Sequence, residues 1–347
     1  MPMTDTPNEI ATRPAWLLPI RAVGGNRWGR RAVMMAQTAL ITGLLAYVFV
    51  MLWRHVGDLR QAHVRLRALP LIASLILAVV RLIGRGALWH LMMAKIVGRF
   101  PLRLDVLVWL CSLVGKYAPG KVLPLLARAR FYGGGAPFAR LSLAFLIEAC
   151  CSLLAAGVVF GAAVLAGAMG SLKALAPAVA AAILLMAALT HPKVLAVGVR
   201  ALCWILRRPA EPLAVRWRDI CLWTLLMALD WVVFGAGLFF LLRSLVDVPA
   251  SLWLYVTGSF ALAAMAGMLA LFAPEGIGVR EGVMATALLY MMPAGLAAAA
   301  SLLSRLWITV AEAACAGCAY ALLGFGRARR PAGRTAEELA SAGQDGQ

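Results

Sequence analysis

The sequence predicts an all-α, polytopic membrane protein with about six to eight spans, some of them broken or re-entrant. Of its 347 residues, 63% are hydrophobic and only 14% are charged, whereas soluble domains carry about 25% charged and about 45–50% apolar residues. Several apolar runs reach the roughly 20 residues that a helix needs to cross about 30 Å of hydrocarbon. Two other apolar regions are interrupted by proline, glycine and charged residues. Little of the chain remains for a soluble domain.

Composition divides the chain into three parts. Residues 1–32 are rich in arginine and proline, and we expect a basic cytoplasmic tail because they lack the apolar core of a signal peptide. Residues 33–325 are expected to form a single transmembrane domain. Residues 326–347 are polar, and we expect a disordered cytoplasmic tail.

Charge and cysteine usage exclude several classes of protein. The net charge of +18 comes from basic residues between apolar runs, which suits cytoplasmic loops and anionic headgroups rather than nucleic acid. The seven cysteines lie in or beside apolar segments, where a free thiol packs as a small apolar group. We therefore expect no metal, no cofactor and no nucleic-acid partner.

The apolar runs predict the spans. Complete spans are expected over residues 33–53, 69–94, 138–166, 172–190, 219–242 and 294–325. The basic connector 191–218 predicts an amphipathic helix on the headgroups. A charge inside a span costs about 2.5–3.5 kcal/mol, so the charged residues there are expected to pair or to face a cavity. They are Arg81, Arg85, Glu148, Asp230, Arg305 and Glu312, although Arg81 and Arg85 could instead snorkel towards the end of their helix.

The two interrupted regions predict re-entrant helical hairpins. Residues 105–118 are too short to span before Pro119-Gly120, and residues 122–131 return from that break. Residues 279–292 are also too short, and they follow the run 251–273 and the break PEGIGVREG. Such breaks are tolerated in a membrane only where they face protein or a water-filled cavity. One break in each half of the chain is typical of a transporter's binding region.

Loop charges predict the topology, because lysine and arginine favour the cytoplasmic side. With both termini inside, the basic connector 191–218 also falls inside, and only the loop 54–68 violates the rule. This topology opens the first hairpin from the cytoplasm and the second from outside. Opposed re-entrant elements are what an inverted repeat produces, although no internal sequence repeat is visible.

The two breaks also carry a family resemblance. The run KYAPGKV at 116–122, followed by Arg128, resembles the first signature of the lysylphosphatidylglycerol synthase transmembrane-region family. The run GIGVREG at 276–282 resembles the second signature, and Arg305 is similarly placed to an arginine of the last helix. The resemblance covers most of residues 33–325 and departs at Glu275, where the pattern usually has glycine. It implies a bacterial inner-membrane protein that moves a lipid between leaflets, here without the synthetase domain.

The candidate substrate-binding residues lie in these motifs. They are Lys116, Tyr117, Pro119, Gly120, Lys121, Arg128, Glu275, Gly276, Gly278, Arg280, Glu281 and Arg305. Their cations are expected to pair with a lipid phosphate, which arginine binds bidentately, and half-helix N-termini would add backbone N–H groups. Glu275 and Glu281 would pair with the arginines when no lipid headgroup is bound between the two breaks, or would bind an amine of the headgroup. The alternative is that all these charges cap broken helices and form structural salt bridges.

Three functions are compatible with the sequence. The first is a flippase or transporter for a phospholipid or lipid-linked molecule, with an anionic or phosphate-bearing headgroup as its partner. The second is an accessory membrane subunit of a glycosyltransferase or an envelope-lipid pathway. The third is an intramembrane enzyme, which is not expected because no HExxH motif or nucleophile turn is present. Homo-oligomerisation and a glycosyltransferase partner stay open.

Overall fold

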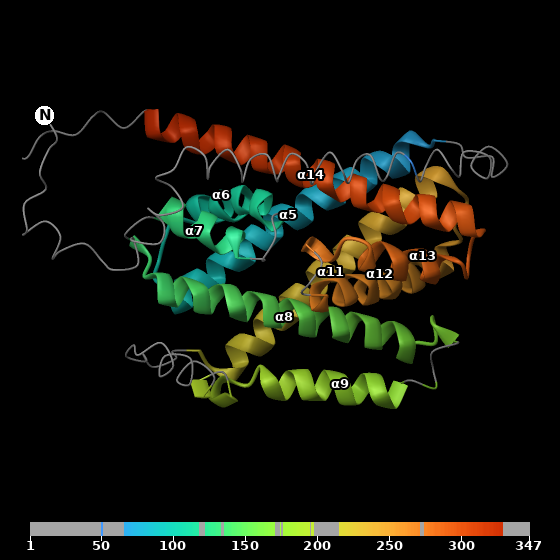
Figure 1. The fold of residues 1–347 in the computed structure, drawn as a ribbon, viewed down its shortest axis with the longest axis horizontal. Coiled ribbons are helices and arrows are strands. Elements are labelled where there is room, and N and C mark those ends of the chain that lie inside the picture. The colour runs from blue at the N-terminus through green and yellow to red at the C-terminus, as the bar shows by residue number, and fades with distance from the viewer. Residues whose placement is uncertain are drawn as a thin grey trace, which may run out of the picture. The chain divides into compact units, whose positions relative to one another are not determined.

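The computed structural model describes residue 50 and residues 66–117, 122–132, 135–170, 174, 176–194, 196–197, 215–270 and 274–328 (Figure 1). Within these ranges the chain is helical and contains no strand, which confirms the predicted all-α class. Apart from Val50, the expected tail 1–32 and span 33–53 lie outside the described residues. So do residues 329–347 and most of the connector 191–218.

Five helices are long and apolar enough to cross a membrane, and they identify an integral membrane protein. They are α5 (Ala68–Ile96), α8 (Phe138–Leu165), α11 (Trp217–Leu245), η4–α12 (Ala250–Leu269) and α14, which spans by Ala294–Leu323 within its full extent of Ala294–Ala328. Helix α9 (Ala176–Leu189) is apolar but shorter. Outward-facing apolar side chains such as Leu69, Val80 and Leu225 are well exposed, as expected for a surface that contacts lipid rather than water.

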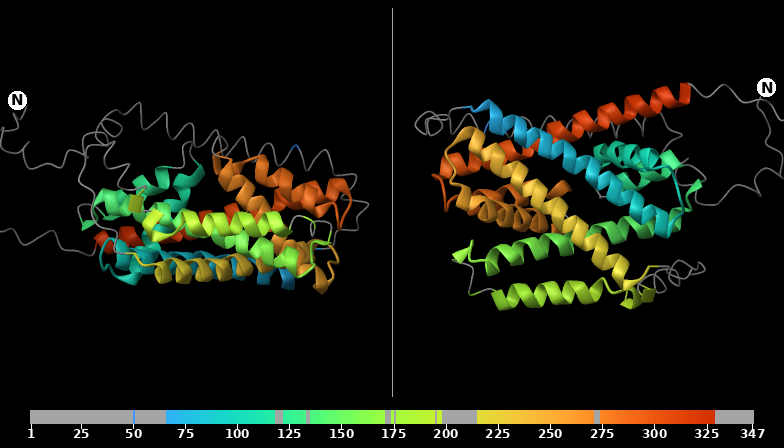
Figure 2. Two further views of the ribbon diagram at one scale, coloured as in Figure 1. Left: turned by 90° about the horizontal axis from the view of Figure 1, so that it is seen from below. Right: turned by 180° about the vertical axis from the view of Figure 1, so that it is seen from behind.

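Helices α5 and α11 form an antiparallel pair. The N–H of Arg67, at the start of α5, donates to the carbonyl of Ser244 at the end of α11 (2.8 Å). At the other end of the pair, Lys95 Nζ lies 3.6 Å from Asp219 Oδ2. Figure 2 shows the two helices running side by side in the view from behind. Each helix therefore ends where the other begins.

The first predicted hairpin is present in the described residues. It comprises α6 (Leu102–Ser112), η1 (Leu113–Tyr117) and α7 (Leu123–Tyr132). Its outer ends meet, because the hydroxyl of Tyr132 donates to Asp105 Oδ1 (2.6 Å). Near the break the two arms come close: a Cβ on Gly115 would lie 2.8 Å from the nitrogen of Pro124. A side chain at position 115 would push the arms apart.

The second hairpin is built in the same way. It comprises η4 (Ala250–Leu252), α12 (Trp253–Leu269), η5 (Pro274–Gly276) and α13 (Val279–Leu288). The hydroxyl of Tyr255 on α12 donates to the carbonyl of Ala287 on α13 (2.6 Å) and holds the outer ends together. Near the break, Gly276 has a φ of +68°, and a Cβ there would lie 2.4 Å from the Cα of Gly267. Glycine is therefore required at position 276.

The two hairpins point towards each other. The first follows the end of α5 and the second follows the end of α11, and these ends lie at opposite ends of the antiparallel pair. The inner ends meet where Lys116 of η1 contacts Glu275 of η5 (3.1 Å). The two breaks, about 150 residues apart in the sequence, therefore meet inside an apolar helical bundle.

Candidate functional site

The meeting point of the hairpins carries five charged side chains, which we call the tip cluster: Lys116, Glu275, Glu281, Arg305 and Glu312. The first hairpin supplies Lys116 from η1, the second supplies Glu275 and Glu281, and α14 supplies the other two. Lys116 Nζ donates to Glu312 Oε1 (2.6 Å) and to Glu275 Oε1 (3.1 Å). One ammonium therefore bridges η5 and α14.

The second half of the tip cluster is a looser pair. Arg305 Nε lies 3.6 Å from Glu281 Oε1, while Glu281 Oε2 accepts the backbone N–H of Gly278 (2.7 Å). Glu281 therefore satisfies one of the donors at the start of α13, a group that we expected to serve an anionic ligand. The carboxylate occupies that position in the structure.

Exposure differs sharply within the tip cluster. The side chains of Arg305 and Glu312 are only 2% and 3% exposed, whereas those of Lys116 and Glu275 are 19% and 24% exposed. Glu275 also has left-handed backbone angles, φ 51° and ψ 20°, which strain a residue that carries a Cβ. The chain thus holds a carboxylate, at some conformational cost, at the most accessible point of the cluster.

Arg280, the second residue of α13, lies beside the tip cluster and is held by aromatic rings. Its Cζ is 4.7 Å from the ring centroid of Phe260 and 5.9 Å from that of Phe234. Within the described part of the chain, the structure gives it neither an ion pair nor a hydrogen bond. The two rings themselves pack edge to face at 4.5 Å. Arg280 therefore lies over two aromatic rings, with its N–H groups uncommitted to these residues.

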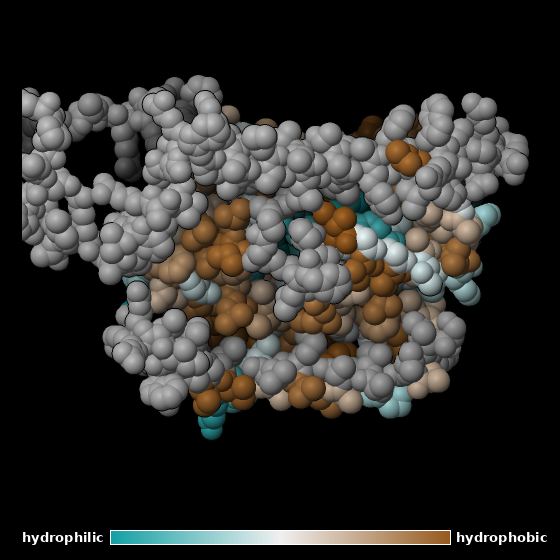
Figure 3. Space-filling model, viewed as in Figure 1, coloured by the Kyte–Doolittle hydropathy of each residue, from teal (hydrophilic) through white to brown (hydrophobic). Residues whose placement is uncertain are grey.

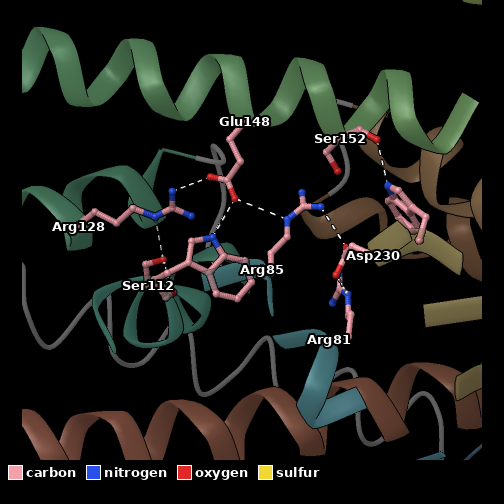
Figure 4. A network of polar contacts seen from close by, with 9 residues as sticks. Arg81, Arg85, Ser112, Arg128, Glu148, Ser152 and Asp230 are labelled. Atoms are coloured by element: carbon pink, nitrogen blue, oxygen red, sulfur yellow. Dashed lines mark hydrogen bonds and ion pairs between the residues drawn. The ribbon is translucent and has the colours of Figure 1, made fainter. Parts of the chain in front are cut away.

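A second group of buried charges, the helix cluster, joins the first hairpin to the long helices: Arg81, Arg85, Arg128, Glu148 and Asp230 (Figure 4). Arg128 of α7 donates from Nη1 to Glu148 Oε2 of α8 (2.6 Å). Arg128 also donates from Nε to Ser112 Oγ (3.1 Å). The arginine thereby fastens both arms of the hairpin to α8.

Arg85 continues the helix cluster towards α11. Its Nε lies 3.7 Å from Glu148 Oε1, and its Nη1 donates to Asp230 Oδ2 (3.1 Å). Asp230 is also 3.3 Å from Arg81 Nε. These side chains are at most 11% exposed. Buried charges need such partners because the loss of hydration is otherwise uncompensated, so the predicted pairing of charges within the spans is observed.

The structure brings together part of the predicted site. Lys116, Glu275, Glu281 and Arg305 form one cluster, and Arg280 lies next to it. Arg128 belongs instead to the helix cluster, where Glu148 neutralises it. Gly276 and Gly278 both have positive φ, 68° and 85°, and form the turn that presents Glu275. Tyr117 ends η1, while Pro119, Gly120 and Lys121 lie outside the described residues.

Some participants were not among the predicted site residues. Glu312 accepts a hydrogen bond from Lys116 (2.6 Å), although in the sequence it stood out only as a charge inside a span. Phe234 and Phe260 position Arg280, and nothing in their sequence context distinguishes them from core aromatics. No group of three or more histidine, cysteine, aspartate or glutamate side chains that could hold a metal occurs among the described residues.

The surface shows polar groups between apolar ones. Figure 3 shows hydrophilic atoms in the middle of one face, with hydrophobic surface on either side.

Comparison of the chain with protein-family models, with curated proteins and with solved structures finds no match.

Proposed function

We propose that this membrane protein moves a phospholipid or a lipid-linked molecule between leaflets, through a polar slot where its two hairpins meet. The observation that carries the proposal is the contact between the two breaks: oppositely directed hairpins place paired charges at one point inside an apolar bundle. A purely structural bundle has little reason to bury these charges, because well-packed apolar residues are often at least as stabilising.

The charged side chains where the hairpins meet could lower the free-energy cost of moving a lipid headgroup across the membrane. An ionised phosphate in hydrocarbon costs far more than a few kcal/mol unless opposite charges meet it. Arg280 offers a planar set of N–H donors that suits a phosphate, and Lys116 and Glu275 are the accessible members of the tip cluster. The acyl chains would remain in the bilayer while the headgroup crosses the slot.

The element order supports an inverted repeat as part of this proposal. A long helix, a broken pair and another long helix occur as α5, α6–α7 and α8, and again as α11, α12–α13 and α14. Helices α5 and α11 are both 29 residues long. Arg81 and Asp230, which contact each other, occupy the same position in these two helices, the fourteenth residue. Inverted repeats in transporters place the binding site at the repeat interface.

The resemblance of the two motifs also indicates a protein family. We propose that the chain is a member of the lysylphosphatidylglycerol synthase transmembrane-region family in the bacterial inner membrane. The positive φ at Glu275, Gly276 and Gly278 supports it, since a glycine-rich turn is what this backbone requires. A glutamate at position 275 then marks where this chain differs from the pattern.

A leaflet-resolved assay tests the function. The protein is reconstituted into liposomes, and a panel of fluorescent lipids, with anionic phosphate, zwitterionic phosphate and phosphate-free neutral headgroups, is followed by chemical quenching of the outer leaflet. We expect faster movement of phosphate-bearing lipids than in protein-free liposomes. Protein-free rates for every lipid, together with stable co-purification of a glycosyltransferase, would instead assign the accessory role.

A further inference from the structure

Two arginines from different helices face the same aromatic ring. Arg81 of α5 has its Cζ 3.9 Å from the ring centroid of Phe234 on α11, and Arg280 of α13 has its Cζ 5.9 Å from the same centroid. Trp231 and Trp307 flank Phe234 with ring centroids at 5.9 and 5.8 Å. The two guanidinium groups therefore share one aromatic platform between the long helices and the second hairpin.

These two arginines differ from Arg85 and Arg128 of the helix cluster in their hydrogen bonds. Arg85 and Arg128 both donate to buried acceptors. Arg81 lies 3.3 Å from Asp230 without donating a hydrogen bond, and its Nε is buried without an acceptor in the described residues. Arg280 likewise donates to no acceptor in that part of the chain. A guanidinium offers five N–H donors, so the pair presents ten that these residues leave unused.

The two arginines differ in how their charge is met. Asp230 is the carboxylate that contacts Arg81, and it is already shared with Arg85. Arg280 has no ion pair with a described residue, although Glu275, Glu281 and Glu312 lie close enough to act on its charge. The aromatic rings attract both cations but cannot accept the several hydrogen bonds that a guanidinium donates. A bound anion would supply the acceptors that these residues do not provide.

We infer that Arg81, Phe234 and Arg280 form a phosphate-binding site, and that it receives the phosphate of the transported lipid. This inference rests on the proposed function and adds Arg81 and Phe234, on the long helices, to the residues of the two motifs. Phe234, together with Phe260 for Arg280, holds each guanidinium over a ring, and a guanidinium so placed can bind a phosphate by paired charge-assisted hydrogen bonds. Because one arginine comes from α5 and the other from the second hairpin, a bound phosphate links the hairpin to the helix pair.

Binding is tested directly, without transport. Isothermal titration of the purified protein in detergent uses dioctanoyl phosphatidic acid, with dioctanoylglycerol as the matched lipid that lacks phosphate and inorganic phosphate as the soluble anion. We expect Arg81→Gln and Arg280→Gln each to weaken phosphatidic acid binding about tenfold or more, and the double variant to lose less than the product of the two effects. Dioctanoylglycerol binding should not change.

Arg243→Gln is the matched control. Arg243 also lies over a ring, with its Cζ 5.7 Å from the centroid of Phe239, but on the last turn of α11 and away from Phe234. Its removal should leave binding unchanged. If a glutamine variant elutes as aggregate in size exclusion, Arg81→Lys and Arg280→Lys replace it, and partial binding is expected because lysine keeps the charge but not the fork.

The outcomes separate this inference from the proposed function. Wild-type affinity for phosphatidic acid in both folded single variants would overturn the site, even if the protein moves lipids. Weakened binding in both variants would support the site, even if no lipid is moved. Inorganic phosphate that binds as tightly as phosphatidic acid would support the anion site and assign it to a soluble phosphate.

Discussion

At the scale of the residue, Glu148 has three polar partners in and around the helix cluster. It accepts from Arg128 and Trp109 (2.6 and 2.8 Å) and lies 3.7 Å from Arg85. Glu148 thus pairs with two buried cations, of which Arg85 is also paired with Asp230. Hydration cannot stabilise these charges, because the side chains of Arg85, Arg128 and Glu148 are all less than a tenth exposed.

Glu148→Gln is expected to destabilise the protein strongly. An uncompensated charge left in a buried pair costs about 3–5 kcal/mol, and here Arg128 loses its counter-charge while Arg85 keeps only Asp230. Thermal unfolding in detergent, followed by size exclusion of heated samples, should show a large fall in the midpoint. Asp247→Asn is the control: its ion pair with Arg67 is solvent-exposed, so the midpoint should hardly move. Equal midpoints for the two variants would contradict the assigned role of Glu148.

Glu275 gives a second prediction, because its backbone is left-handed. Glycine adopts φ 51° without the Cβ clash, which costs about 1–2 kcal/mol in other residues. Glu275→Gly should therefore be more stable than Glu275→Ala by about 1 kcal/mol, while both lose the same contact with Lys116. Chemical unfolding in detergent compares the two variants. A glycine variant that is the less stable of the two would show that the turn is not strained.

At the scale of the element, each hairpin is closed at its outer end by a tyrosine. Tyr132 donates to Asp105 and accepts from Trp89 (2.9 Å), whereas Tyr255 donates to one backbone carbonyl. The first closure is a buried network and the second is a single bond. Their loss should therefore have different consequences.

Tyr132→Phe and Tyr255→Phe test the two closures. Tyr132→Phe leaves the buried indole N–H of Trp89 without its acceptor, a penalty of about 1–3 kcal/mol, whereas Tyr255→Phe removes one bond worth about 1 kcal/mol. Hydrogen exchange read by mass spectrometry should increase in α7 for the first variant and, by a smaller amount, in α13 for the second. Unchanged exchange in α7 would contradict the assignment of Tyr132 as the closing residue.

Elements were the easiest feature to predict from the sequence. Apolar length fixed the long helices, and the short runs beside Pro119 and Pro274 indicated the hairpins, because a broken apolar run has few ways to satisfy its backbone. Partners were harder to predict. The residues Arg81 and Arg85 showed that charge enters the second predicted span, but only the crossing of α5 and α11 brings Asp230 to them. Likewise, Glu312 lies almost 200 positions from Lys116, and no local pattern joins them.

At the scale of the whole molecule, the antiparallel α5–α11 pair sets the direction of both hairpins. Its two ends are marked by Lys95 with Asp219 and by Arg67 with Asp247. If the termini and the basic connector are cytoplasmic, the end at Lys95 faces the cytoplasm and the end at Asp247 faces outward. The two hairpins then enter the bundle from opposite sides of the membrane, as expected for the two halves of an inverted repeat.

Cysteine labelling of intact cells tests this orientation. In a background without native cysteines, Arg99→Cys, an exposed position just after α5, should be protected from a membrane-impermeant maleimide. Asp247→Cys, on the loop after α11, should be labelled. Both sites should react after the cells are permeabilised. If Arg99→Cys is labelled in intact cells and Asp247→Cys is protected, the orientation of the protein in the membrane is the opposite of the one predicted.

The central claim is that both hairpins act on one headgroup in one slot, and a double-variant cycle on lipid translocation tests it most directly. Lys121→Ala alters the first motif, Arg280→Ala alters the second, and initial rates for a labelled phosphate-bearing lipid are measured in proteoliposomes with equal amounts of folded protein. We predict that each variant is slowed and that the double variant is slowed by less than the product of the two effects, because shared function is non-additive. Arg280→Lys should restore part of the rate. Full translocation by Arg280→Ala, or effects of the two variants that simply multiply, would contradict the claim.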